Sequence, residues 1–401
     1  MANRRDALTR RARARYAMIG GFLGAGKSTA VGQLARRLTG RGLSVGLITN
    51  DQGRGLVDTQ SLRRQGFPVE EIAGGCFCCR FSSLEGAVKG LESSERPDLF
   101  IAEPVGSCTD LVATVSYPLR RLYGDRFDIA PLSVMVDPVR AARVLGLEAG
   151  RHFSPKVSYV YRKQLEEAHV LVINKIDLLA EPRRRELRQA LEARYPQARL
   201  FEVSARSGEG LDAWFEDLET RALPDPATAS GLEIDYATYG EGEALLGWLN
   251  ATLAVEAASE FDGSAWLEAF ARGLQQRLIA AEAEVAHLKM TLAPEHGVAS
   301  AGAGDLAQVH LVHHDFVPEL AQRLAAPVER AQLVVNLRAE ASPQALEGVL
   351  RAAAAESLEA RLEHVESFRP GQPRPTHRET IPSGALSPRA EGAAGSREAA
   401  R

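Results

Sequence analysis

The chain has 401 residues, of which 45% are hydrophobic and 25% are charged, and its formal net charge is −4. This composition is typical of a globular protein long enough for two domains, and the charge balance gives no reason to expect a nucleic-acid or anionic-membrane partner. No apolar run approaches the roughly 18 residues that a membrane span needs. We therefore predict a cytoplasmic protein, in which clustered cysteines stay reduced and bind metal or react.

The N-terminal two thirds of the chain alternate short apolar runs with helical stretches. After an Arg-rich leader at residues 1–14, which we expect to be disordered, strand candidates lie at residues 16–20, 44–50, 98–103, 132–137, 169–175 and 199–205. Continuous Val/Ile/Leu runs of this kind are typical of strands buried on both faces of a sheet. Residues 15–224 are therefore predicted to form a wound α/β domain with a mostly parallel sheet.

A Pro-rich linker at residues 225–235 separates this domain from a smaller one. Residues 236–365 hold a long strand around 244–257, a helix from Ser264, three further strands and a closing helix from Pro343. We expect an α+β domain that presents or receives a partner, with its helices on one face of a sheet. Residues 366–401 are rich in Pro, Gly, Ser and Arg and are predicted to be a disordered tail.

The stretch GFLGAGKST directly follows the first strand and opens a helix. It fits G-x-x-x-x-G-K-S, the phosphate-binding loop (P-loop) pattern. Its glycines let backbone amides wrap a phosphate, Lys27 reaches the β- and γ-phosphate oxygens, and the Ser28 hydroxyl suits Mg²⁺. The predicted nucleotide-binding residues of this loop are Gly21, Phe22, Leu23, Gly24, Ala25, Gly26, Lys27, Ser28 and Thr29.

The sequence NKID at the end of a later apolar strand predicts the nucleotide base. Asn174 and Asp177 can hydrogen-bond a guanine edge, and the stem of Lys175 can cover the ring. Ser204 and Ala205, at the end of the next strand candidate, complete this base site. We therefore predict GTP and GDP rather than the adenine nucleotides.

Two acidic residues at strand ends are candidates for holding Mg²⁺. Asp51 follows the second strand and Glu103 the next long apolar run, on the rim where open α/β sheets bind ligands. We predict that they assist Lys27 in catalysis and that the backbone of Gly106 senses the γ-phosphate. The alternative is that either acid is a solvated loop residue.

The stretch GGCFCCR holds three of the four cysteines. Thiolates suit Zn²⁺ and also bind Co²⁺, and Cys76, Cys78 and Cys79 are predicted to be the ligands. Gly74 and Gly75 supply dihedral freedom. Arg80 is expected to favour ionised thiols. Three thiolates leave one position of a tetrahedral ion open, which suits transfer, whereas a structural zinc site or a redox-sensing thiol cluster is the alternative.

Two further groups of side chains are considered as metal ligands. Cys108, five residues after Glu103, is a tentative fourth thiol that GTP brings to the cluster, or else a packing residue. His310, His313 and His314 do not share one face of a strand, so we predict surface imidazoles rather than a second metal site.

In this order, GGFLGAGKST, GGCFCC, EPVG and NKID resemble the CobW-like GTPases, relatives of HypB and UreG, over residues 15–222. The resemblance implies a Mg²⁺-dependent GTPase that carries Zn²⁺ or Co²⁺ to a client metalloprotein or a cofactor-pathway enzyme. The chain differs from the family at residues 50–53, where N-E-F-G is replaced by N-D-Q-G, and it lacks a long His-rich tract. A regulatory GTP-binding metal or redox sensor, and a GTPase partner in corrinoid-enzyme maturation, are the alternatives.

Overall fold

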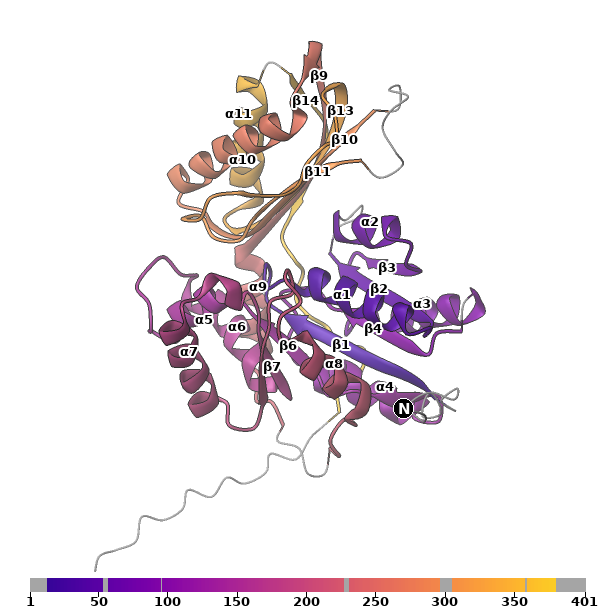
Figure 1. Cartoon of the computed structure of the whole chain (residues 1–401). Helices are drawn as coiled ribbons and strands as arrows, with labels where there is room; N and C mark the ends of the chain where they lie inside the picture. The colour runs from indigo at the N-terminus through magenta and orange to yellow at the C-terminus, as the bar shows by residue number, and fades with distance from the viewer. Residues whose placement is uncertain are drawn as a thin grey trace, which may run out of the picture.

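The structure is a computed structural model, and it describes residues 13–52, 57–94, 96–226, 231–295, 305–357 and 359–379. Two bodies are stacked in it, a wound α/β domain and a smaller domain seated on top (Figure 1). Residues 1–12 of the predicted leader lie outside the described residues. No helix among the residues described is long and apolar enough to cross a membrane.

The first domain is built on an eight-stranded sheet whose strands pair in parallel, in the order β3-β2-β4-β1-β6-β7-β8, with β5 beside β1. This confirms the predicted fold class. The strands are β1 (Ala14–Gly21), β2 (Val45–Asp51), β3 (Val69–Ala73), β4 (Leu99–Glu103), β5 (Phe127–Ile129), β6 (Ser133–Val136), β7 (Val170–Ile173) and β8 (Arg199–Glu202).

Helices cover both faces of this sheet, as a parallel sheet with buried strands requires. They are α1 (Lys27–Gly40), α2 (Val57–Arg64), α3 (Phe81–Ser94), α4 (Tyr117–Tyr123), α5 (Pro138–Val144), α6 (Pro155–Glu167), α7 (Glu181–Arg194) and α8 (Leu211–Thr220), with a π-helical turn at Val112–Ser116 and a 3-10 turn at Ile176–Leu178. The sequence did not predict β3, because this edge strand carries Glu70 and Glu71 between Val69 and Ile72 and forms no apolar run.

The second domain is a six-stranded antiparallel sheet in the order β12-β11-β10-β13-β9-β14, with two helices on it. This confirms the second, smaller α+β domain. Its elements are β9 (Leu246–Phe261), α10 (Gly263–Ala280), β10 (Glu284–Pro294), β11 (Ala307–Leu311), β12 (Glu319–Gln322), β13 (Val328–Glu340), α11 (Pro343–Glu356) and β14 (Ala360–Phe368).

The two faces of this C-terminal sheet differ in polarity. One face carries apolar residues such as Leu253, Leu288 and Val335, which form one core with Leu274 of α10 and Leu350 of α11. Side chains alternate along a strand, so the residues between these point the other way. That second face is polar and meets the first domain through His287, Lys289, His310, Asn336 and Arg338.

Helix α9 (Tyr236–Leu245) joins the two domains. Although we predicted that the C-terminal domain begins at residue 236, α9 packs closely against α6 of the first domain. A side chain at Gly242 would lie 2.5 Å from the Lys156 carbonyl oxygen and 2.8 Å from Val160. Helix α9 therefore carries its buried residues, among them Glu243, toward the first domain.

The predicted disordered tail is wrong for residues 366–379. Strand β14 extends to Phe368, and the chain then returns to the first domain, where Thr376 N donates to Cys78 O at 2.8 Å and Glu379 N donates to Ala113 O at 2.9 Å. Backbone hydrogen bonds of this kind order a Pro-rich segment whatever its composition. Residues 380–401 of the predicted tail lie outside the described residues.

Candidate functional site: a phosphate-binding loop beside a cysteine cluster

The P-loop joins β1 to α1 at the carboxyl edge of the parallel sheet. Gly21, Gly24 and Gly26 have φ values of 125, 78 and 93°. Only glycine adopts such values without strain. A side chain at Gly21 would also lie 2.4 Å from the Met135 carbonyl oxygen. Lys27 folds back across the loop, and its Nζ donates to Gly21 O at 2.9 Å and to Phe22 O at 3.3 Å.

A cavity of about 850 Å³ opens over this loop. Most of the predicted P-loop residues line it, namely Leu23, Gly24, Gly26, Lys27, Ser28 and Thr29. Phe22 and Ala25 are instead buried, and the Phe22 ring packs 5.5 Å from Phe153 and 5.6 Å from Tyr161. These two residues can therefore offer a nucleotide only their backbone.

The predicted magnesium residues meet at one end of the cavity. Ser28 Oγ donates to Glu103 Oε1 at 2.9 Å, and Asp51 lies on the neighbouring strand, 3.3 Å from the Arg338 guanidinium of the C-terminal sheet. Gly106 follows Glu103 and contacts the P-loop, since a side chain there would lie 3.0 Å from Leu23 N. Hydroxyl and carboxylate oxygens are the donors that Mg²⁺ prefers, so this set fits that ion.

The predicted base-binding residues lie at the opposite end. Asn174 Nδ2 donates to Ala25 O at 2.8 Å, and Asn174 Oδ1 accepts from Ala205 N at 2.9 Å. Lys175 Nζ donates to Gly24 O at 2.7 Å. Asp177, Ser204 and Ala205 line the cavity with them. The NKID segment thus supports the P-loop and also faces the space for the base.

Sequence reasoning missed Asp137, which follows β6 and accepts from Lys175 Nζ at 2.7 Å. Burial by itself would raise the pKa of Asp137, but Lys175 and His313 outweigh it and hold that pKa well below its usual range. The sequence did contain a signal for Asp137, because this acid ends a predicted strand and Pro138 directly after it indicates the start of a helix.

The interpretation of His313 and His314 as surface imidazoles is wrong, because both are buried between the domains. His313 Nε2 lies 2.9 Å from Asp137 Oδ1, and His314 Nδ1 lies 2.9 Å from Glu284 Oε2. His310 lines the nucleotide cavity instead. The three side chains thus have separate environments, although not for the predicted reason, because β11 ends at Leu311 and His313 and His314 lie in the loop after it.

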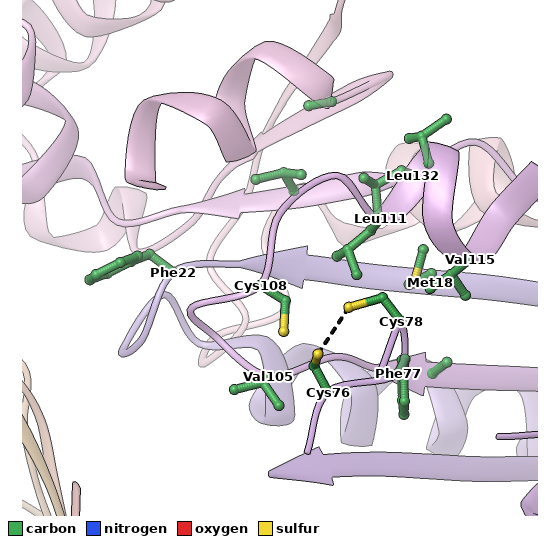
Figure 2. Close-up of a cluster of buried hydrophobic side chains, with 14 of the residues drawn as sticks. Met18, Phe22, Cys76, Phe77, Cys78, Val105, Cys108, Leu111, Val115 and Leu132 are labelled. Atoms are coloured by element: carbon green, nitrogen blue, oxygen red, sulfur yellow. Dashed lines mark hydrogen bonds between the residues drawn. The ribbon is translucent and has the colours of Figure 1, made fainter. Parts of the chain in front are cut away.

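The cysteine loop connects β3 to α3, next to the P-loop edge of the sheet. Cys76 Sγ lies 2.9 Å from Cys78 Sγ, Cys78 Sγ lies 3.8 Å from Cys79 Sγ, and the three sulfurs all lie within 4.8 Å of one another (Figure 2). A tetrahedral zinc ion with bonds of about 2.3 Å requires sulfur separations of about 3.8 Å. The Cys78–Cys79 pair has this separation, and Cys76 has to move outward by about an ångström to admit the ion.

Hydrogen bonds within the cluster divide the four thiols into two kinds. The pKa of Cys76 is lowered by hydrogen bonds with Cys108, Cys78 and Cys79, whereas the pKa values of the other three are raised, that of Cys79 to about 11. Arg80, which we expected to favour ionised thiols, donates instead to the Gly74 carbonyl oxygen at 3.1 Å. These hydrogen bonds therefore favour ionisation of Cys76 over that of its three neighbours.

Cys108 comes to this cluster from the loop after β4, and its sulfur is directed toward Cys76 and Cys78 (Figure 2). The same loop begins at Glu103, in the nucleotide cavity. Gln164 of α6 holds it in the middle, because its Nε2 donates to Gly106 O and to Cys108 O, each at 2.9 Å.

The C-terminal segment of residues 374–379 covers the cysteine loop and is called here the tail strap. Arg374 N donates to Cys79 Sγ at 3.1 Å, the His377 ring packs 4.8 Å from Phe81, and Arg378 Nε donates to Asp110 Oδ2 at 2.7 Å. Cys76, Cys78 and Cys108 are buried, and Cys79 is half-buried beneath the strap. The amino-acid composition of residues 374–379 did not predict that they cover the cysteine loop.

A P-loop between a strand and a helix, at the carboxyl edge of a parallel sheet, defines a P-loop nucleotide-binding domain. Residues 15–202 match the family model described as the CobW/HypB/UreG nucleotide-binding domain, so this segment of the chain is similar to that family.

Two curated relatives are named for zinc. The chain is 27% identical over 215 residues to the zinc chaperone CobW of Sinorhizobium sp., a match that covers 48% of this chain and 59% of the relative. It is 24% identical over 212 residues to zinc-regulated GTPase metalloprotein activator 1 of Dictyostelium discoideum, covering 46% of this chain and 44% of the relative. The chain thus spans about half the length of these relatives.

Solved structures with a similar fold include the hydrogenase maturation factor HypB of Archaeoglobus fulgidus. It is 22% identical with a TM-score of 0.37, and the match covers 54% of this chain and 93% of that one. The Zn(II)-bound YjiA GTPase from E. coli is 12% identical with a TM-score of 0.37, covering 86% of this chain and 98% of that one.

Proposed function

We propose that this protein is a GTP-binding and GTP-hydrolysing metallochaperone that binds Zn²⁺ or Co²⁺ at Cys76, Cys78 and Cys79 and delivers it to a client. The client is a metalloprotein or a cofactor-pathway enzyme, and the setting is the cytoplasm, where thiols remain reduced. The family of residues 15–202 and the names of the zinc-related relatives support this proposal.

One observation carries it: two chain segments each run from the nucleotide cavity to the cysteine cluster. In the first, Asp51 lines the cavity and Asn50 holds the cysteine loop. In the second, Glu103 lies beside Ser28, and Cys108 faces Cys76. Because both segments are short, we propose that binding of a ligand at one site changes the affinity of the other site for its own ligand.

The residues of the cavity act on GTP by binding and orientation. Loop amides and Lys27 hold the β- and γ-phosphates, and Asn174 with Asp177 positions the guanine. Ser28, Asp51 and Glu103 would hold Mg²⁺, which neutralises charge on the phosphates. The sequence assigns no arginine to catalysis, so we propose that hydrolysis is slow without a partner.

A regulatory GTP-binding metal sensor is the second candidate, and one observation favours it. The thiols are buried and covered by the tail strap, which protects a bound ion from exchange. The two functions differ in what hydrolysis does. A chaperone releases its ion to an acceptor when GTP is hydrolysed, whereas a sensor retains it.

The experiment follows transfer of Zn²⁺ from loaded protein to a chromogenic chelator, with GTP and with a non-hydrolysable GTP analogue. Faster transfer of Zn²⁺ with GTP than with the analogue supports the chaperone. Equal transfer rates with GTP and with the analogue support the sensor. Lys27→Ala should lose nucleotide binding and any GTP-dependent transfer while keeping its metal content. Lys89→Ala, an exposed lysine of α3, is the matched control. If Lys27→Ala hydrolyses GTP like wild type, the P-loop assignment is wrong.

A further inference from the structure

The nucleotide cavity has a second wall that comes from the C-terminal sheet. Besides the P-loop and the NKID segment, it is lined by residues of β9, β10, β11 and the loop after β11, among them Trp248, His287, Lys289, His310, Val312 and Phe316. A ligand that fills a cavity between two domains contacts both of them. The identity of the residues on the second wall therefore indicates which part of the ligand each strand meets.

Neighbouring strands of the C-terminal sheet cross the cavity from its base end to its magnesium end. At the base end, His313, directly after β11, lies 2.9 Å from Asp137, the partner of Lys175. At the magnesium end, Arg338 of β13 lies 3.3 Å from Asp51. Strand β10 lies between β11 and β13. Its cavity-facing residues His287 and Lys289 therefore meet the middle of the cavity, where a P-loop holds phosphates.

Strand β10 is also fixed close to the P-loop. A side chain at Gly24 would lie 3.0 Å from the Ala286 carbonyl oxygen and 2.8 Å from Val312 Cγ1. The buried Arg140 stacks 5.0 Å from the Phe22 ring and donates to Val312 O at 2.9 Å. The P-loop and the residue before His287 are thus in direct contact.

The charges around His287 support an anion at this point. His287 is buried, and its pKa is held well below its usual range by burial and then by the positive charges of Lys289, Arg338 and Lys27. Cations contributed by both domains therefore surround one neutral imidazole. Bringing these cations together is electrostatically unfavourable, and a phosphate group between the two domains relieves that repulsion.

We propose that Lys289 binds the terminal phosphate of GTP, so that the C-terminal domain distinguishes GTP from GDP. This inference rests on the proposed function, because it requires a guanine nucleotide on the P-loop. An ammonium ion suits this role, since it supplies a compact charge and three donors to phosphate oxygens. When the terminal phosphate leaves, one bond between the C-terminal sheet and the ligand is lost, which couples hydrolysis to the contact between the domains.

The test compares the dissociation constants of a fluorescent GDP and a fluorescent non-hydrolysable GTP analogue for wild type, Lys289→Ala and Lys289→Arg. We expect Lys289→Ala to weaken binding of the GTP analogue by about tenfold or more and to leave GDP binding within about twofold. Lys289→Arg should restore most of the loss because it retains the charge. Arg330→Ala is the matched control, a basic residue of the same sheet that is exposed and outside the cavity lining.

Each outcome decides the proposal. Unchanged GDP binding also shows that Lys289→Ala is folded. Equal affinity of wild type and Lys289→Ala for the GTP analogue overturns the role of Lys289. An equal loss of affinity for both nucleotides in Lys289→Ala overturns it as well. If wild type binds neither nucleotide, the proposed function itself is wrong. If wild type and Lys289→Ala bind both nucleotides equally well, only the role of Lys289 is wrong.

Discussion

Asn50 and Asp51 are consecutive residues at the end of β2 and both line the cavity, yet only the Asn50 side chain also holds the cysteine loop. Asn50 Nδ2 donates to Ile72 O at 2.9 Å and to Gly75 O at 2.7 Å, and Asn50 Oδ1 accepts from Phe77 N at 3.0 Å. Asp51 lines the nucleotide cavity. The end of β2 therefore contributes two consecutive residues to the cavity, and one of them also supports the cysteine loop.

Asn50→Ala should weaken metal binding more than nucleotide binding. The substitution removes three hydrogen bonds from the cysteine loop, and leaving buried partners unsatisfied costs about 1–3 kcal/mol each. We expect zinc affinity to fall by at least about tenfold, measured by competition with a chelator of known affinity. Thr39→Ala, an exposed change at the end of α1, should bind zinc like wild type. Unaltered zinc affinity in Asn50→Ala would contradict the role given to Asn50.

Asp177→Asn should change the base preference. Asp177 is exposed and lines the cavity, so the substitution is expected to alter recognition with little effect on stability. The carboxylate accepts from the guanine ring, and an amide instead complements the xanthine ring. Competition between GTP and xanthosine triphosphate measures the change, with Glu181→Gln of the nearby α7 as control. An unchanged preference for GTP would exclude the base site at NKID.

Removing the tail strap should expose the cysteine cluster. A chain ending at Arg369 lacks the contacts of Arg374 and Thr376 with Cys79 and Cys78, whereas a chain ending at Glu379 retains them. We expect the shorter chain to react with a thiol reagent about tenfold faster or more, because thiol reactivity depends on access. The chain ending at Glu379 should react like wild type. Identical rates in all three chains would show that the strap gives no protection.

Cys108→Ser tests whether the loop after β4 carries a metal ligand. With the GTP analogue bound, we expect wild type loaded with Co²⁺ to show stronger thiolate charge-transfer absorption than Cys108→Ser, in proportion to one sulfur ligand. Metal affinity of the wild type should then depend on the nucleotide, by a coupling of about 1–3 kcal/mol. If the two proteins have the same spectrum and affinity, Cys108 only packs against Cys76.

Glu167 should make the stability of the protein depend on pH. Burial and the nearby Asp110 raise the pKa of this carboxyl from 4.5 to about 8, so between these values the folded state binds a proton that the unfolded state has released. The free energy of unfolding therefore falls as pH rises through this window, by on the order of 5 kcal/mol at most.

The variant Glu167→Gln cannot ionise and should lose this contribution. Denaturant unfolding at several pH values from 5 to 8 measures it, with the free energy of unfolding of the variant rising relative to that of wild type as pH increases. Parallel profiles for the two proteins would mean that Glu167 does not carry the proton.

The local features of this protein were determined by the sequence itself. The P-loop needs glycines at fixed positions between a strand and a helix, and such spacing is legible without a structure. The buried strands were predicted from continuous apolar runs, and the cysteine loop from residues adjacent in the chain. The carboxyl ends of parallel strands meet at one edge of a sheet, which is why Asp51, Glu103 and NKID were expected around one cavity.

Only the tertiary structure decided which residues that are distant in the chain contact one another. Lys289 reaches the nucleotide cavity and Arg338 reaches Asp51 because the polar face of an antiparallel sheet packs on the P-loop edge. Alternation along a strand predicts a polar face but not its partner. Residues 374–379 were predicted to be disordered because composition reports burial of apolar surface, whereas their order comes from backbone hydrogen bonds to the cysteine loop.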